Sequence, residues 1–192
     1  MPNFRRIFRP GGTYFFTQVT EKRQPILTSD LARPLLRTAI ERTRERWPFE
    51  IQAWVLLPDH LHAIWTLPPE DCDYSRRWGF LKKEFTKAYL LAGGSEAPVT
   101  AGRSRDGRRG VWQPKFWEHT VVDQWDYERH FHYLHYNPVK HGLAESPSQY
   151  PWSTFHRHVR AGVYEPEWGG SEDPDLLREF ERLNASAIEY GE

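Results

Sequence analysis

Two histidines separated by one residue offer the clearest chemistry in this chain of 192 residues. His60 and His62 flank Leu61 at the start of the apolar stretch 63–65. Side chains alternate across a strand, so both imidazoles are predicted to point to one face while Leu61 points to the other. Two imidazoles at this spacing can hold one divalent metal ion. The alternative is a pair of partly exposed strand histidines that make ordinary hydrogen bonds.

A tyrosine and an asparagine four residues apart form the second candidate site. Tyr133 and Asn137 occupy positions i and i+4 of a predicted helix, which places them on one face about one turn apart. A phenol and an amide oxygen could therefore converge on one metal-bound phosphate. The alternative treats Tyr133 as a core aromatic residue and Asn137-Pro138 as the cap of a following turn. Four nearby histidines stay open as extra ligands or surface residues: His130, His132, His135 and His141.

The elements that must position these side chains follow from hydrophobic periodicity and turn residues. Strands are predicted at 13–20, 50–57, 60–67 and 116–122, with the second and third forming a hairpin, and helices at 30–46, 74–91 and 123–137. Asp123 is expected to cap the last helix, and Pro138 to end or kink it. The order β-α-β-β-α-β-α predicts an α+β fold, a ferredoxin-like sandwich with helices packed on a central, mainly antiparallel sheet.

Composition excludes several classes of protein. The single cysteine, Cys72, rules out an internal disulfide framework and favours a reducing, intracellular setting. No apolar run approaches the ~20 residues of a membrane-spanning helix. The formal net charge is zero, but residues 1–164 carry 24 Lys and Arg against 17 Asp and Glu, while residues 165–192 carry 2 against 9. A basic body rich in aromatic residues predicts a polyanionic partner, with a solvated surface and a disordered end as the alternative.

Five segments together resemble the single-tyrosine transposases with an HUH motif, and in particular their REP-associated branch. Leu57–Trp65 (LPDHLHAIW) resembles the HUH motif, and Trp112–His119 and Tyr133–Gly142 resemble later motifs of that branch. Gly11–Thr17 and Trp152–His156 are similar as well, so the resemblance spans roughly residues 4–168. It implies a compact α+β domain that acts on single-stranded DNA, whose palindromic repeat folds into a hairpin beside a short guide sequence.

The resemblance also implies roles for individual residues. His60 and His62 match the metal-binding histidines, Tyr133 matches the nucleophile, and Asn137 matches the polar residue that completes the metal site. This donor set is consistent with Mg²⁺ or Mn²⁺. Attack by Tyr133 would leave a 5′-phosphotyrosine link and a free 3′-hydroxyl, so strands could be cleaved and rejoined without ATP. Two other functions stay open: a non-catalytic single-stranded nucleic-acid-binding module, and a metal-dependent hydrolase with water as the nucleophile.

DNA contacts are expected from basic side chains that bind phosphate and from aromatic rings that stack on bases. For each candidate, a solvated helix face or a core position is the alternative. The candidates are Arg5, Arg6, Arg9, Lys82, Lys83, Arg108, Arg109, Lys115 and Arg157 for phosphate, and Trp117, Trp152 and Phe155 for stacking.

Residues 1–164 are predicted to form the transposase domain, and two regions depart from the family pattern. The first is a flexible basic loop at 93–111, which is longer than the corresponding segment of the family. Residues 165–192 form an acidic tail, which we expect to fold over the basic surface and restrain activity. The resemblance favours a monomer, with a dimer as the alternative, located in the cytoplasm and associated with the nucleoid when bound to DNA.

Overall fold

A four-stranded antiparallel sheet forms the centre of the protein. The computed structural model describes residues 8–170, so residues 1–7 and 171–192 lie outside the described part. The spatial order of the strands is β2-β3-β1-β4, and every neighbouring pair is antiparallel. This order, with the predicted β2-β3 hairpin, confirms the α+β fold of ferredoxin-like type. The strands are β1 (Thr13–Val19), β2 (Glu50–Leu56), β3 (His60–Thr66) and β4 (Trp117–Thr120).

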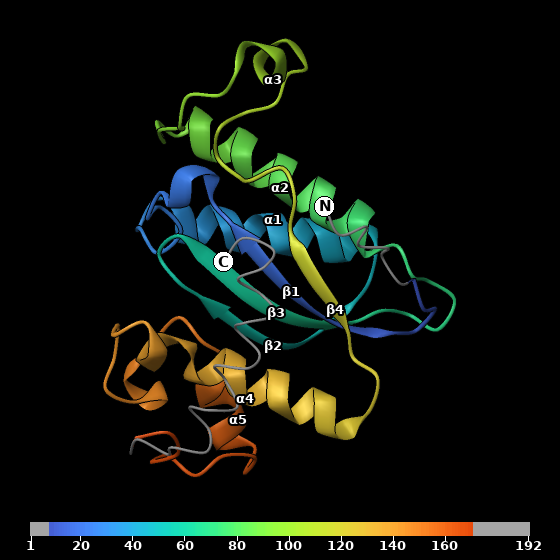
Figure 1. The fold of residues 1–192 in the computed structure, drawn as a ribbon, viewed down its shortest axis with the longest axis vertical. Helices are drawn as coiled ribbons and strands as arrows, with labels where there is room; N and C mark the ends of the chain where they lie inside the picture. Colours follow the sequence, from blue (N-terminus) through green and yellow to red (C-terminus); the bar gives the residue numbers. More distant parts are fainter. Residues whose placement is uncertain (1–7, 171–192) are drawn as a thin grey trace, which may run out of the picture.

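Helices cover both faces of the sheet (Figure 1). On one face lie α1 (Ala32–Arg46) and α2 (Tyr74–Leu91), and on the other lie α4 (Gln124–Lys140) and α5 (Phe155–Arg160). Alternation along β3 explains the division, because Leu61 and Trp65 enter the core under α1 and α2, while Ile64 enters the core under α4 and α5. We call these the first core and the second core. No helix within residues 8–170 is both long and apolar enough to cross a membrane.

The helix that carries Tyr133 runs further than the sequence predicts. The prediction of an end near Asn137 is wrong, because α4 continues through Pro138 to Lys140. A proline inside a helix removes its own N–H bond, but the backbone can resume the pattern beyond it, and here His141 N donates to the Asn137 carbonyl at 3.0 Å. Asp123 caps the helix as predicted, since its carboxylate accepts a hydrogen bond from a backbone N–H of the first turn.

The segment 93–111, expected to be a flexible loop, contains a short helix, α3 (Ala101–Arg105). Arg103 pairs with both carboxylate oxygens of Glu21 at 3.0 and 2.9 Å, and Arg109 donates to Glu96 at 2.8 Å. Both carboxylates partly neutralise the basic segment. Glu21 fastens it to the body, whereas Glu96 belongs to the segment itself, and the flexibility of the segment stays a prediction. Two short 3₁₀ helices complete the elements, η1 (Glu21–Arg23) and η2 (Pro147–Gln149).

A buried arginine holds α2 against the loops around it. Arg77 is fully buried, and its guanidinium donates to the carbonyls of Trp47 and Pro48 and to Asp71 Oδ2, at 3.3, 2.8 and 2.8 Å. Arg77→Met leaves these acceptors without their donor, so we expect a loss of about 3 kcal/mol in the free energy of unfolding. Arg76→Met is the control, because Arg76 pairs with the same carboxylate from an exposed position and should cost less than about 1 kcal/mol. Urea unfolding curves with equal losses would contradict this account.

Candidate active site

The paired histidines lie on the sheet face that α4 covers. His60 is 3% exposed and His62 is fully buried. Their ring centroids are 5.1 Å apart, and their planes meet at 82°. In the β1-β3 register, His62 lies opposite Thr17 of the neighbouring strand. The imidazoles therefore share one face of β3, as the alternation predicts.

A hydrogen bond at Nδ1 orients each imidazole. His60 Nδ1 lies 2.6 Å from Asp59 Oδ1, and because a carboxylate only accepts, this nitrogen carries the proton. His62 Nδ1 lies 2.9 Å from Thr17 Oγ1. In both rings Nε2 is therefore the atom that could bind an ion, an arrangement typical of metal-binding histidines with an orienting partner.

The electrostatics of the site favour a neutral His62 and an ionised Asp59. Burial, followed by the nearby His60, holds the pKa of His62 well below its usual value. Burial would raise the pKa of Asp59, but the hydrogen bonds from His60 and Arg23 outweigh it and lower that pKa to about 2. A neutral imidazole is the form that binds a metal ion, so the site presents His62 as a ligand at neutral pH.

Tyr133 lies on the face of α4 that packs against the sheet. Its ring centroid is 5.5 Å from that of His62, and the residue is 4% exposed. Tyr136 is equally buried, but its ring faces Trp168 at 6.4 Å in the second core. Of these two tyrosines, Tyr133 is the one that meets the histidine pair.

Asn137 follows Tyr133 by one turn of α4 and is fully buried. Both polar atoms of its amide are buried, and neither makes a hydrogen bond of ordinary geometry to a residue within 8–170. The amide still lies close enough to His62 to oppose, in part, the lowering of that pKa by burial. A buried amide normally has hydrogen-bond partners, so these residues fit a cation held by His60, His62 and the Asn137 oxygen.

The structure adds Lys140, which the sequence analysis did not select. Its Nζ donates a hydrogen bond of 3.1 Å to the Tyr133 hydroxyl. The contact depends on α4 continuing through Pro138, because residues i and i+7 share a face only while the helix lasts. This spacing was the signal that could have identified Lys140. An ammonium at this position can stabilise negative charge on the phenol oxygen.

The other four histidines of this region serve different parts of the structure. His132 and His135 both hydrogen-bond one buried tyrosine hydroxyl of the second core, at 2.9 and 3.2 Å. His130 hydrogen-bonds the carbonyl one turn earlier in α4. Of the four, His141 comes nearest to the pair, with its ring centroid 5.0 Å from that of His60. His141 is therefore the remaining candidate for an additional ligand.

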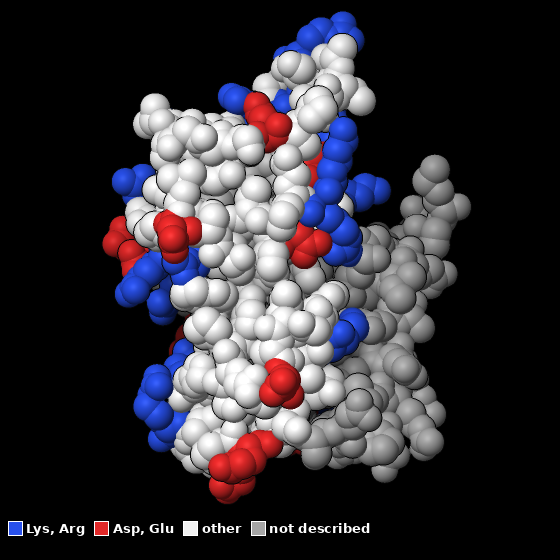
Figure 2. Space-filling view, turned by 90° about the vertical axis from the view of Figure 1, so that its left-hand side faces the viewer, with Lys and Arg blue, Asp and Glu red and all other residues white. Residues whose placement is uncertain are grey.

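A basic groove lies between α2 and the segment 103–114, with a volume of about 870 Å³. We call it the α2 groove. Figure 2 shows Lys and Arg side chains from the tip at α3 downward along the body, with single acidic groups between them. The basic residues that line the groove are Lys82, Lys83, Lys87, Arg103, Arg108 and Arg109, four of which were predicted to bind DNA.

A second groove, of about 1010 Å³, lies between α1, the edge strand β2 and the segment 151–157. We call it the α1 groove. Trp152 is 36% exposed in it, and the Arg33 guanidinium stacks 3.8 Å from the centre of the Trp152 ring. The prediction selected Trp152 and Arg157 here, but missed the arginines of α1, because a basic helix face looks like a solvated one in sequence. The charged residues of this groove are Asp30, Arg33, Arg37, Arg44 and Arg157.

The remaining predicted DNA contacts lie outside these grooves. Phe155 was wrong as a stacking platform: it is fully buried in the second core, because α5 turns this side chain toward the sheet. Trp117 is half-buried and packs against the same core. Arg9 and Lys115 are exposed but line neither groove, and Arg5 and Arg6 lie outside the described residues.

Comparison with known proteins identifies similar chains from other sources. The chain is 42% identical over 171 residues to the REP-associated tyrosine transposase of Escherichia coli (strain K12), covering 88% of this chain and 92% of that protein. It is 40% identical over 176 residues to a Haemophilus influenzae protein with the same family name, and the match covers 92% of this chain and 97% of that protein. A solved REP-associated tyrosine transposase bound to a REP hairpin matches with a TM-score of 0.72 and 41% identity. This match covers 89% of this chain and 93% of the solved one. No family model matches the chain.

Proposed function

The chain belongs to the family of REP-associated tyrosine transposases, and from that premise we propose that it cleaves and rejoins single-stranded DNA at repetitive extragenic palindromes. The proposed substrate is a DNA hairpin, because a solved relative is bound to a REP hairpin. The short guide sequence beside the hairpin is proposed from the resemblance in sequence alone. One observation carries the proposal: the Tyr133 ring, the histidine pair and the buried Asn137 amide converge on one face of the sheet.

His60, His62 and the Asn137 oxygen would hold a divalent ion, Mg²⁺ or Mn²⁺. Oxygen ligands suit both ions, and Mn²⁺ tolerates imidazole better. When bound, such an ion polarises the scissile phosphate and offsets its negative charge. The protein contributes the orientation of the ligands, since Asp59 and Thr17 hold the two imidazoles at Nδ1.

Tyr133 would supply the nucleophile. Its oxygen attacks phosphorus and forms a 5′-phosphotyrosine bond, the bond from phosphorus to the 3′-oxygen breaks, the phenol loses its proton, and the leaving 3′-oxygen gains one. Lys140 would stabilise the charge on the phenol oxygen as that proton leaves. The phosphotyrosine conserves the energy of the phosphodiester, so a second 3′-hydroxyl can reverse the step and join strands without a nucleotide cofactor.

Replacing Lys140 with methionine is expected to slow adduct formation by about 100-fold, because it removes a charged donor from the reacting oxygen. Lys140→Arg keeps the charge and should retain a larger share of the rate. Single-turnover assays of the covalent protein–DNA adduct measure both variants. A wild-type rate in Lys140→Met would mean that the contact has no part in the reaction.

The two grooves would hold the DNA. The α2 groove is basic and offers phosphate contacts, whereas the α1 groove adds an exposed tryptophan on which an unpaired base can stack. The α1 groove also runs along β2, the strand next to the one that carries the histidines. We therefore assign the hairpin stem to the α2 groove and the unpaired flanking bases to the α1 groove.

Trp152→Ala is expected to weaken binding of a hairpin with a single-stranded flank by about 10-fold, because it removes the stacking platform. Trp125→Ala is the matched control: it is also exposed and lies under an arginine, Arg129, but lines neither groove. Fluorescence anisotropy at fixed salt measures both affinities. Equal losses in the two variants would argue against base stacking in the α1 groove.

The arrangement favours a monomer as the active form. Tyr133 and His62 of the same chain already lie within ring contact, so one chain can assemble the proposed site. The proposed place of action is the cytoplasm, with the protein associated with the nucleoid while it holds DNA. The domain boundary near residue 164 and the restraining role of the acidic tail are also proposals, and most of the tail lies outside the described residues.

A hairpin-bearing single-stranded oligonucleotide, incubated with the full chain and Mg²⁺ or Mn²⁺ and then run on a denaturing gel, tests the proposal. We expect cleavage together with a covalent protein–DNA adduct. Cleavage without an adduct would support a hydrolase that uses water. Binding with neither cleavage nor adduct would support a passive nucleic-acid-binding module.

A further inference from the structure

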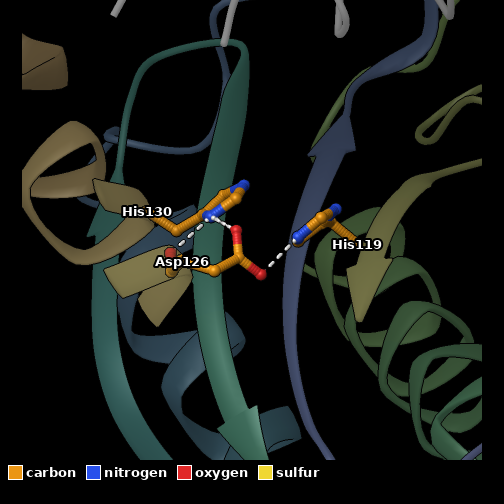
Figure 3. Close-up of side chains that lie close together, drawn as sticks. All are labelled: His119, Asp126 and His130. Carbon is orange, nitrogen blue, oxygen red and sulfur yellow. Dashed lines mark hydrogen bonds and ion pairs between the residues drawn. The ribbon is translucent and has the colours of Figure 1, made fainter. Parts of the chain in front are cut away.

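A second group of potential metal ligands lies between β4 and α4, apart from the histidine pair. His119 comes from β4, and Asp126 and His130 lie one turn apart on α4 (Figure 3). One ligand atom from each residue lies within 4.8 Å of the others. Phe15 packs against both His62 and His130, with ring centroids 5.3 and 4.9 Å away, so an apolar ring separates the two groups.

The carboxylate of Asp126 lies between the two imidazoles and contacts each of them through a different oxygen. His119 Nε2 lies 2.8 Å from Asp126 Oδ2, and His130 Nδ1 lies 3.1 Å from Asp126 Oδ1. The two imidazoles stack at 4.4 Å with their planes at 18°. Ligands of a tetrahedral ion with bonds of about 2.0–2.2 Å lie roughly 3.3–3.6 Å apart, and the ion lies near the plane of each imidazole. The ligand atoms, which lie within 4.8 Å of one another, would therefore have to draw together, and one of the stacked rings would have to rotate, to surround one ion.

Burial and access also suit an ion. The side chains of Asp126 and His130 are 11% and 4% exposed, whereas that of His119 is 34% exposed and opens the group to solvent. Burial would raise the pKa of Asp126, but hydrogen bonds from both histidines outweigh it and keep the carboxylate ionised. An ion would replace these hydrogen bonds, together with the 2.8 Å hydrogen bond between His130 Nδ1 and the Asp126 carbonyl, and the proton on each binding nitrogen would move to the other nitrogen of that ring.

We propose that His119, Asp126 and His130 form a second cation site, which binds Zn²⁺ with water in the position open to solvent. Two imidazole nitrogens and one carboxylate oxygen are ligands that Zn²⁺ accepts in tetrahedral geometry. The ion would link β4 to the half of α4 that precedes Tyr133, and would thereby fix the helix that carries this tyrosine. Binding here is independent of DNA cleavage, so its failure would leave the proposed function intact.

Zinc titration calorimetry on the full chain tests the site in a background that lacks the first one. The His60→Ala/His62→Ala double variant is expected to bind one equivalent of Zn²⁺. Adding His119→Ala should weaken this binding at least about 100-fold, because it removes one of three ligands. Adding His156→Ala instead is the control, since His156 lies outside both groups and contacts the Tyr150 carbonyl. No zinc binding in the double variant, or unchanged binding after His119→Ala, would overturn the proposal and leave a hydrogen-bond network.

Thermal unfolding provides a second readout that does not depend on the double variant. With free Zn²⁺ at about 100 times the dissociation constant, the Tm of the wild-type chain should rise by roughly 5 °C or more. Part of this rise in Tm should persist in His62→Ala, because the second site is intact there. Adding His119→Ala to that variant should abolish the remaining rise. His119 is half-buried, so this variant is expected to fold, and circular dichroism of the metal-free protein checks that it does. An equal rise with and without His119 would contradict the site.

Discussion

Tyr133→Phe is expected to abolish the covalent protein–DNA adduct, with a loss of at least about 10³-fold in cleavage rate. The change removes one oxygen atom, the one that Lys140 contacts, and leaves the ring that packs against His62. Because the packing of the ring is retained, the fold and the binding of the hairpin should stay close to wild type. A denaturing gel measures the adduct, and anisotropy measures the affinity for DNA.

Tyr136→Phe is the matched control for this variant. It lies on the same helix with the same burial, but it faces Trp168 and not the histidine pair. We expect it to form the adduct at nearly the wild-type rate. An adduct that survives in Tyr133→Phe and disappears in Tyr136→Phe would reassign the nucleophile and would end the mechanism proposed here.

His62→Ala is expected to lower cleavage by at least about 10³-fold and to remove its dependence on Mg²⁺ or Mn²⁺. His62 is fully buried beside the Asn137 amide and the Tyr133 ring, so its loss removes one of the two imidazoles from the proposed metal site. Chelation of the metal in the wild-type protein should produce the same loss, and added Mn²⁺ should reverse it. In His62→Ala, added Mn²⁺ should restore little activity.

Two comparisons separate loss of the metal ligand from loss of the fold. His156→Ala removes a histidine outside the site and should leave cleavage unchanged. Hairpin binding by His62→Ala in the absence of metal should match that of the wild-type protein. Metal-dependent cleavage at the wild-type rate in His62→Ala would mean that the pair on β3 is not the metal site.

Local patterns were sufficient to predict most of the elements. The helix at 74–91 and the hairpin of strands β2 and β3 agree with the structure to within a residue or so. The same holds for the pairing of His60 with His62 on one face, because alternation in a strand is a property of a few consecutive residues. The i, i+4 relation of Tyr133 and Asn137 is equally local.

Other features depended on how the elements pack. The sequence offered Phe155 as an aromatic residue that could stack on a base, but local patterns predicted no helix there and did not show that α5 turns this side chain into the second core. The arginines of α1 resemble a solvated helix face until the segment 151–157 folds over the edge of β2 and creates a groove with them. Pro138 illustrates a different limit, since a preference against proline in helices was overridden by the packing of α4 on the sheet.

The sequence by itself determined which side chains share a face: the two imidazoles on one strand, and the phenol and the amide on one helix. It also determined the α+β class, because local periodicity and turn residues predict the order of strands and helices along the chain. Only the tertiary structure decided that α4 lies over β3, that Lys140 reaches the Tyr133 hydroxyl, and that His119 meets Asp126 and His130. The physical reason is the separation along the sequence of the residues involved. Periodicity depends on residues close together within one element, whereas contacts between elements depend on the packing of the whole core.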